Sequence, residues 1–233
     1  MEINLNLDII PSFEKKIFLD PRVEIKTHYN NFKKMYFQIN CRMFEETYES
    51  IRFVYTLLYY FTNKDNFSKS SLLYEYTSTN INLNKSLIII GGVGTGKTSV
   101  LKTLRAMINQ NPQLNLKFMT TKDVVSEYES TLQEDLFDFF DKLNNGNLII
   151  DDLMSESIAS RFGKKELFED ILFKRCENNK IITLITMNYL EEFPNNADEA
   201  ILELYQRYGQ RVFDRILGNF NFIILKDKSF RKW

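Results

Sequence analysis

The segment GGVGTGKT, residues 91–98, has the residue types and the spacing of a phosphate-binding loop. It satisfies the pattern G-x-x-x-x-G-K-[ST], in which backbone N–H groups surround phosphate oxygens. Four of the eight glycines in the chain fall within six residues here. Glycine is favoured where the backbone takes a positive φ or where another group approaches closely. The residues expected to hold the phosphates are Gly91, Gly92, Val93, Gly94, Thr95, Gly96, Lys97, Thr98 and Ser99.

Lys97 and Thr98 carry the chemistry of this loop. The lysine is expected to place its ammonium against the β- and γ-phosphates of ATP, and the threonine hydroxyl to ligate Mg²⁺. The alternative is a glycine-rich turn with an incidental lysine. An apolar run at 87–90 precedes the loop and a helical pattern, KTSVLKTLRAMINQ, follows it. This strand-loop-helix setting is the one that the motif requires, so it favours the phosphate site.

A pair of carboxylates follows another apolar run, NLIIDDL. Asp151 lies 151 − 97 = 54 residues after Lys97 and is expected to hold the Mg²⁺ shell. Asp152 is placed to orient or activate the attacking water, although it could instead cap the following turn. Because adjacent strand residues point to opposite faces, both carboxylates reach one site only at a strand end.

Asn188 ends the next apolar run, LITMN. Its amide can hold a water against the γ-phosphate, but asparagine also follows strands because it suits turns. The position of Asn188 after a buried strand, itself next after the aspartate strand, favours a functional role.

Three arginines recur at intervals of four in ELYQRYGQRVFDRI: Arg207, Arg211 and Arg215. They share one helix face if Gly209 does not break the helix. Glu203 precedes Arg207 by four residues, so we expect Arg207 to make an ordinary ion pair on a solvated face. Arg215 could be offered to the γ-phosphate of a neighbouring subunit, where it would neutralise charge in the transition state. The active unit would then be an oligomer.

Strands and helices are expected to position these residues. After residue 85, short continuous apolar runs alternate with helical patterns. Such runs suit strands that are buried on both faces of a parallel sheet. Residues 81–233 are therefore expected to form a three-layer α/β domain with a five-stranded parallel sheet. The runs are LIII (87–90), LKFMTT (116–121), NLIIDDL (147–153), KIITLITMN (180–188) and FNFIIL (220–225).

Residues 1–80 contain no catalytic motif and are predicted to form a separate, mainly helical region. Pro11 and Pro21 indicate an irregular start. One amphipathic helix is predicted from about Asn40 to Thr62, because apolar residues recur there at helical spacing. These residues are Phe44, Tyr48, Ile51, Tyr55 and Leu58.

The composition excludes several classes of protein. The net charge is −1, so no global basic field is available for nonspecific nucleic-acid binding. The two cysteines lack the CxxC spacing of a metal site. The first residues lack the pattern of a secretion signal, and the longest apolar run, at 53–61, is too short to cross a bilayer. We expect a cytoplasmic protein that does not contact membranes.

The chain resembles the ATPase core of the DnaC/IstB family, within the AAA+ class, in four segments. These are the phosphate loop, LIIDD, the Asn of TMN, and YGQRVFDRI before the last strand. The resemblance covers about residues 80–233. It implies that Lys97 and Thr98 form the Walker A pair, that Asp151 and Asp152 form the Walker B pair, and that Asn188 is sensor 1. AAA+ proteins more often carry Glu at the position of Asp152, which implies slow hydrolysis that DNA or a partner stimulates.

By the same resemblance, Arg215 is similar to the trans-acting arginine finger and Arg211 to its companion at the subunit contact. Eight residues, 226–233, follow the last strand, so no C-terminal lid domain is expected. Shortened forms of this kind are typical of the family.

The resemblance implies two functions that the core motifs do not separate. DnaC-type proteins load a replicative helicase onto single-stranded DNA, and IstB-type proteins assist a transposase. Residues 1–80 are expected to bind the partner, while Thr120, Thr121 and Lys122 are candidate DNA contacts. A small-molecule P-loop kinase is a third and weaker alternative.

Overall fold

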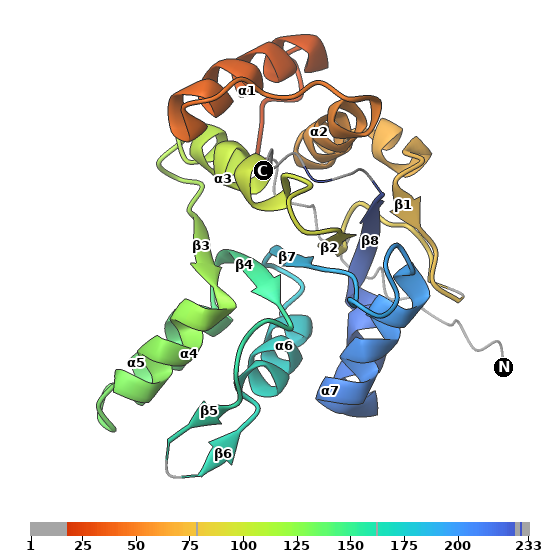
Figure 1. The fold of residues 1–233 in the computed structure, drawn as a ribbon. Coiled ribbons are helices and arrows are strands. Elements are labelled where there is room, and N and C mark those ends of the chain that lie inside the picture. Colours follow the sequence, from red (N-terminus) through yellow and green to blue (C-terminus); the bar gives the residue numbers. More distant parts are fainter. Residues whose placement is uncertain (1–17, 78, 162, 227–228, 230–233) are drawn as a thin grey trace, which may run out of the picture.

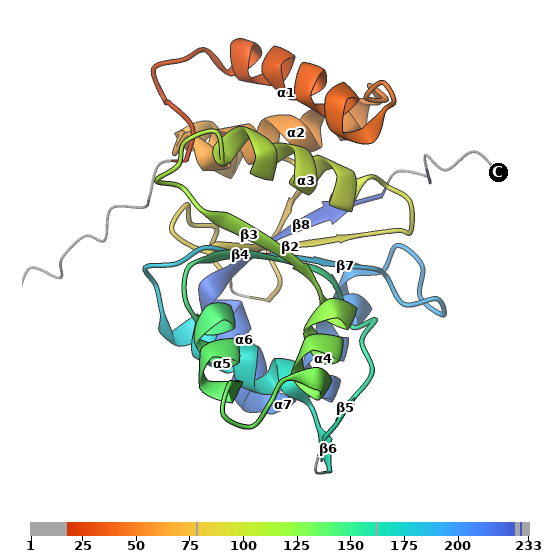
Figure 2. The same ribbon diagram turned by 90° about the vertical axis from the view of Figure 1, so that its left-hand side faces the viewer.

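The computed structural model describes residues 18–77, 79–161, 163–226 and 229. The chain is arranged in layers around a central sheet (Figures 1 and 2). Helices α1, α2 and α3 cover one face, with α1 outermost, and helices α4 to α7 cover the other. This is the three-layer α/β arrangement expected from the sequence.

The central sheet has six strands in the order β1-β8-β2-β7-β4-β3. Five of them pair in parallel, which confirms the prediction, and the two-residue β1 pairs antiparallel with β8. So short a strand has no periodic pattern, and it was therefore not predicted. The strands are β1 (Leu73–Tyr74), β2 (Ser86–Gly91), β3 (Leu116–Thr120), β4 (Asn147–Leu153), β7 (Thr183–Met187) and β8 (Phe220–Leu225); β5 (Ala159–Ser160) and β6 (Lys164–Lys165) form a separate hairpin.

The helices after the phosphate loop lie where the sequence predicts them. They are α3 (Lys97–Ile108), α4 (Thr121–Ser130), α5 (Leu136–Asn144), α6 (Leu167–Glu177) and α7 (Ala197–Asn219). Gly209 breaks α7 into two helical segments, because its φ of 74° and ψ of 167° are not helical. Within the described part of the chain, no helix has the length and apolar character needed to span a membrane.

The N-terminal region differs from its prediction. It has two helices, α1 (Ile25–Asn40) and α2 (Tyr48–Phe61), followed by a 3₁₀ turn, η1 (Asp65–Lys69). The single helix predicted from Asn40 to Thr62 is wrong at its start, because the Thr47 side chain caps α2 through the backbone N–H of Ser50. Helix α1 lies where an irregular start was expected, although its buried aromatic residues have helical spacing: Tyr29, Phe32 and Tyr36.

The described part of residues 1–80 shares a hydrophobic core with α3 and β2. Leu58 is fully buried, Tyr55 stacks on Tyr29 at 4.9 Å, and Tyr60 donates a hydrogen bond to the Lys85 carbonyl. Most of the apolar stripe of α2 therefore packs on the chain itself. A separate partner-binding unit at residues 1–80 stays a prediction.

The two cysteines should differ sharply in reactivity. Cys41 is exposed, whereas Cys176 is buried on α6 and burial raises the pKa of its thiol to about 12. Only the thiolate reacts with an alkylating reagent, so native protein at pH 8 should lose one thiol quickly and the second only on unfolding. Thiol titration with and without denaturant measures this. The variant Cys41→Ser is the control, and rapid labelling of native Cys41→Ser would contradict the packing of α6.

Candidate active site

The phosphate loop joins β2 to α3, and glycine is favoured at its positions for different reasons. Gly94 and Gly96 both have a φ of 85°, in the left-handed region that favours glycine. At Gly91 the cause is close approach, since a Cβ there would lie 2.9 Å from the Cβ of Leu225 on β8. A Cβ added at Gly92 would make only an ordinary contact, 3.7 Å from Thr95 Cγ2.

A cavity of about 530 Å³ lies at the carboxyl ends of the parallel strands, over this loop. Its size suits a nucleotide. It brings together the side chains that the sequence singled out, although they lie far apart along the chain. The lining residues are 93–99 of the loop, Asp151, Asp152, Thr186, Asn188 and Arg42. Gly91 and Gly92, which were predicted, do not line the cavity, and Thr186 and Arg42 were not predicted.

Thr98 and Asp151 meet in this cavity as the metal-site prediction requires. The Thr98 hydroxyl lies 2.9 and 3.0 Å from the two carboxylate oxygens of Asp151. Hydroxyl and carboxylate oxygens are the ligands that Mg²⁺ prefers. The side chains present therefore fit this ion.

Asp152 reaches the same cavity through a distortion of its strand. Its φ is 64°, and the register of β4 against β7 shifts between Ile150 and Leu153. An irregularity of this kind re-aims a side chain, so the two adjacent aspartates do not point to opposite faces. The sequence predicted the need for a strand end here, but not the left-handed residue that meets it.

Asn188 bridges the lysine and the second aspartate. Its Nδ2 donates to Asp152 Oδ1 at 2.7 Å, and its Oδ1 accepts from Lys97 Nζ at 3.0 Å. Because an ammonium can only donate and a carboxylate can only accept, these partners fix the orientation of the amide. The Lys97 ammonium also donates to the carbonyl of Gly92 at 2.9 Å.

Thr186 is a site residue that the sequence reasoning missed. Its buried hydroxyl donates to Asp151 Oδ1 at 2.7 Å and accepts the backbone N–H of Asp152 at 2.9 Å. It therefore holds both aspartates from the neighbouring strand, β7. A signal was present, because residues two apart on a strand share a face, and Thr186 precedes Asn188 by two.

Arg207 does not lie on the solvated face expected for it. Its guanidinium bonds to Glu156 at 2.9 Å and Glu166 at 3.0 Å, and donates to the Met154 carbonyl at 3.2 Å. The Glu156 side chain is fully buried and also accepts from Tyr208 at 2.8 Å. Arg207 thus holds the segment that follows Asp152 at the end of β4.

Arg211 and Arg215 lie beyond the break at Gly209. Both guanidinium groups stack on the ring of Phe173 in α6 at 4.1 Å, and Arg215 lies 3.7 Å from Glu177. Neither lines the phosphate cavity of its own chain. The three arginines therefore do not form one stripe.

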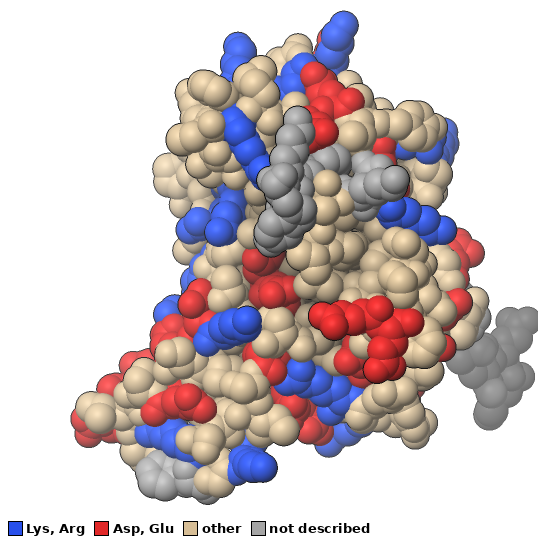
Figure 3. Space-filling model, in the orientation of Figure 1, with Lys and Arg blue, Asp and Glu red and all other residues tan. Residues whose placement is uncertain are grey.

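The candidate DNA contacts begin α4. Thr120 caps this helix by accepting from the Asp123 N–H, and Lys122 is exposed. Thr121 is fully buried and donates to the carbonyl of Asp152, so it is unavailable to DNA. On the face shown in Figure 3, Lys and Arg are interspersed with Asp and Glu and form no continuous basic surface.

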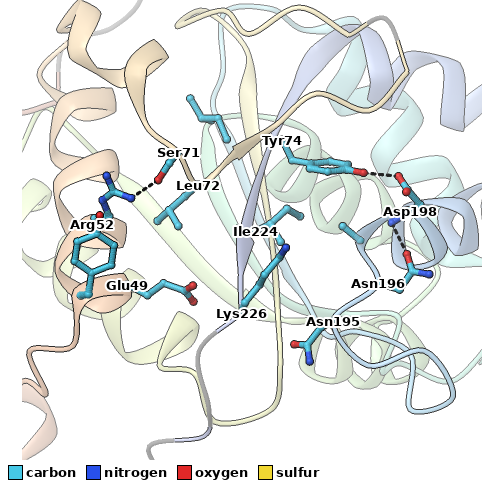
Figure 4. Close-up of a pocket in the computed structure, with 13 residues that line it drawn as sticks. Glu49, Arg52, Ser71, Leu72, Tyr74, Asn195, Asn196, Asp198, Ile224 and Lys226 are labelled. Carbon is cyan, nitrogen blue, oxygen red and sulfur yellow. Dashed lines mark hydrogen bonds between the residues drawn. The ribbon is translucent and has the colours of Figure 1, made fainter.

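A second cavity, of about 420 Å³, lies at the β1 edge of the sheet and contains none of the predicted site residues (Figure 4). Four of its polar side chains form two pairs. Arg52 donates to Ser71 and stacks on Tyr48 at 4.5 Å, while the Tyr74 hydroxyl donates to Asp198 at 2.6 Å. That bond raises the pKa of Tyr74 to about 12.

Comparison with known families decides the class of the protein. Residues 62–203, more than half of the chain, match the model of the bacterial DnaA ATPase domain. The chain belongs to this family. It is a nucleotide-binding P-loop ATPase of the AAA+ class, related to proteins of DNA replication. No curated protein matches it in sequence.

Solved structures share the fold of this AAA+ ATPase at low identity. The DnaC helicase loader is 20% identical with a TM-score of 0.54, over 78% of this chain and 93% of that one. A putative primosome component from Streptococcus pyogenes serotype M3 is 16% identical with a TM-score of 0.51, over 80% and 84%. Identities this low establish a common fold, and the expected DnaC-like core is confirmed at that level.

Replacing Thr186 should separate ATP binding from hydrolysis. Thr186→Val keeps the shape but removes a hydrogen bond to a buried carboxylate, worth about 1.5–3 kcal/mol. We expect ATP turnover to fall at least tenfold while the phosphate loop still binds nucleotide. Steady-state phosphate release and nucleotide titration measure the two effects. Thr186→Ser, which keeps the hydroxyl, is the control; equal turnover in both variants would contradict the role of Thr186.

Proposed function

We propose that this AAA+ ATPase is a cytoplasmic replication factor that places a replicative helicase on single-stranded DNA and is switched by ATP hydrolysis. The observation that carries the proposal is the convergence of Lys97, Thr98, Asp151, Asp152 and Asn188 in one cavity, on a fold shared with the DnaC helicase loader. The fold alone does not fix a function. The site supplies the switch, and the N-terminal region would supply partner choice.

The residues divide the work of phosphoryl transfer among them. Lys97 and the loop N–H groups would hold the β- and γ-phosphates. Thr98 and Asp151 would hold Mg²⁺, which when bound neutralises charge on the phosphate oxygens. Asp152 would accept the proton of the attacking water, and Asn188, already bonded to Asp152, would position that water. The Asp152 side chain is one methylene shorter than Glu, so we expect slow turnover that DNA or a partner stimulates.

Self-association would complete this site. Arg215 is half-buried and Arg211 exposed on the α6–α7 surface, away from the cavity of their own chain. There Arg215 can serve the γ-phosphate of a neighbouring subunit, with Arg211 at the contact. Stacking on Phe173 orients both guanidinium groups before any contact forms.

The helicase would bind the outer surface of α1. Phe37 and Met43 are 53% and 76% exposed there, in a groove of about 610 Å³ that Lys33 and Lys34 flank. Exposed apolar side chains within a charged rim are typical of docking surfaces. This surface replaces the predicted α2 stripe, most of which packs against the hydrophobic core of the chain.

Assembly should need both ligands of the switch. We expect a multimer only when a non-hydrolysable ATP analogue and single-stranded DNA are both present, because Arg215 would bridge two subunits through the γ-phosphate. Light scattering coupled to size exclusion measures this. Arg215→Ala should prevent assembly but leave nucleotide binding intact, and Arg22→Ala, at an exposed pair with Asp20, is the control.

A multimer that Arg215→Ala still forms would refute the arginine-finger assignment. A monomer under all conditions would count against the loader, and turnover stimulated by a metabolite would identify a kinase instead. The IstB-type alternative uses the same core residues, and it would be favoured if a transposase, rather than a helicase, stimulated turnover.

The α1 groove should control helicase binding without affecting the ATPase site. Phe37→Ser should weaken co-purification with the replicative helicase at least tenfold, because one exposed aromatic anchor can carry more than 1 kcal/mol of binding. Basal ATP turnover should not change. Phe137→Ser, at a 78% exposed position on α5, is the matched control. Equal loss in both variants, or in neither, would refute this surface.

A further inference from the structure

The segment between α1 and α2, residues 41–47, lies against the phosphate loop. A small cavity of about 40 Å³ is enclosed between Arg42, Met43 and Glu45 on one side and Thr95 and Gly96 on the other. Arg42 also lines the larger cavity that holds Lys97 and the aspartates. The N-terminal region therefore forms part of the wall of the candidate nucleotide site.

Side-chain contacts on both sides of Arg42 place this segment beside α3. Before it, the Asn40 side chain ends α1 with a bond to the Tyr36 carbonyl at 3.0 Å and lies 3.4 Å from the Thr103 hydroxyl of α3. After it, the Phe44 ring packs edge-on against Phe32 at 5.2 Å. Helix α3 itself begins at the phosphate loop. These contacts place Arg42 beside the phosphate loop.

The Arg42 side chain is exposed, and among the described residues it makes no hydrogen bond, ion pair or ring contact. The eight other described arginines all have such a partner. They are Arg22, Arg52, Arg105, Arg161, Arg175, Arg207, Arg211 and Arg215. A guanidinium held at the mouth of a phosphate cavity and bonded to no protein group is available to a ligand.

We propose that Arg42 binds the phosphates of the nucleoside triphosphate in its own chain. Guanidinium groups bind phosphate oxygens through two parallel hydrogen bonds, at any physiological pH. Among the described residues that line the cavity, Lys97 is the one other side-chain cation, against the carboxylates of Asp151 and Asp152. A second cation would offset the added negative charge of a triphosphate. The inference rests on the nucleotide binding that underlies the proposed function.

The same segment would connect nucleotide binding to partner binding. Met43, the next residue, belongs to the α1 groove that we propose for the helicase, and Phe44 lines that groove as well. When Arg42 holds phosphate, the backbone of residues 41–47 loses freedom, and the edge of the groove is fixed with it. Nucleotide and helicase would thus favour the same conformation of one segment.

The experiment titrates purified protein with fluorescent ATP and ADP in the presence of Mg²⁺. We expect Arg42→Ala to weaken ATP binding about tenfold, as loss of a charge-assisted bond would, and Arg42→Lys to restore part of it. Lys26→Ala removes an exposed charge at the far end of α1, roughly 20 Å or more away, and should not change binding. Lys97→Ala should abolish it, and thermal unfolding of all variants should be similar.

Hydrogen exchange of residues 41–47 provides the second measurement. ATP should slow exchange of this segment in the wild type and in Lys26→Ala, but not in Arg42→Ala. ATP binding and protection that are unchanged in Arg42→Ala would overturn the proposal while leaving the phosphate site intact. A wild-type protein that binds no ATP would overturn the proposed function itself, so the two failures are distinct.

Discussion

The buried carboxylate of Asp151 is the group on which the site depends. A charge removed from water is tolerated only if other groups donate hydrogen bonds to it. Here Thr98, from the first turn of α3, and Thr186, from β7, both donate to it. The carboxylate therefore ties the helix after the phosphate loop to two neighbouring strands. The hydrogen bonds to this carboxylate hold the loop, β4 and β7 in their relative positions, and these positions define the site of phosphoryl transfer.

The distortion at the end of β4 is the second constraint. Asp152 and Met154 both have positive φ, which costs energy for residues other than glycine. The surrounding bonds hold this conformation: Thr186 accepts the Asp152 N–H, Thr121 donates to the Asp152 carbonyl, and Arg207 donates to the Met154 carbonyl. Strain at this point has a chemical use, because it turns the second carboxylate into the cavity beside the first.

The N-terminal helices are packed together with the helix that follows the phosphate loop. They pack on α3 in one hydrophobic core, and α3 begins at Lys97. A displacement of the α1–α2 segment would therefore be transmitted to the phosphate loop through this core. Arg211 and Arg215 belong to α7, which lies in the opposite helical layer (Figure 2), and there we propose that they meet a neighbouring subunit.

The sequence by itself determined the parallel sheet, the phosphate loop and, of the twelve described residues that line the cavity, all but Thr186 and Arg42. These follow from local rules: continuous apolar runs, the glycine spacing of the loop, and polar residues at strand ends. Tertiary structure alone decided the rest, because it depends on partners distant in the chain. Thr186 became a site residue only because β7 pairs with β4, and Arg207 became an ion-pair partner of the buried Glu156 only because α7 packs beside the segment that follows β4. Arg42 lines the phosphate cavity only because the N-terminal helices pack on α3, and that contact joins segments about fifty residues apart.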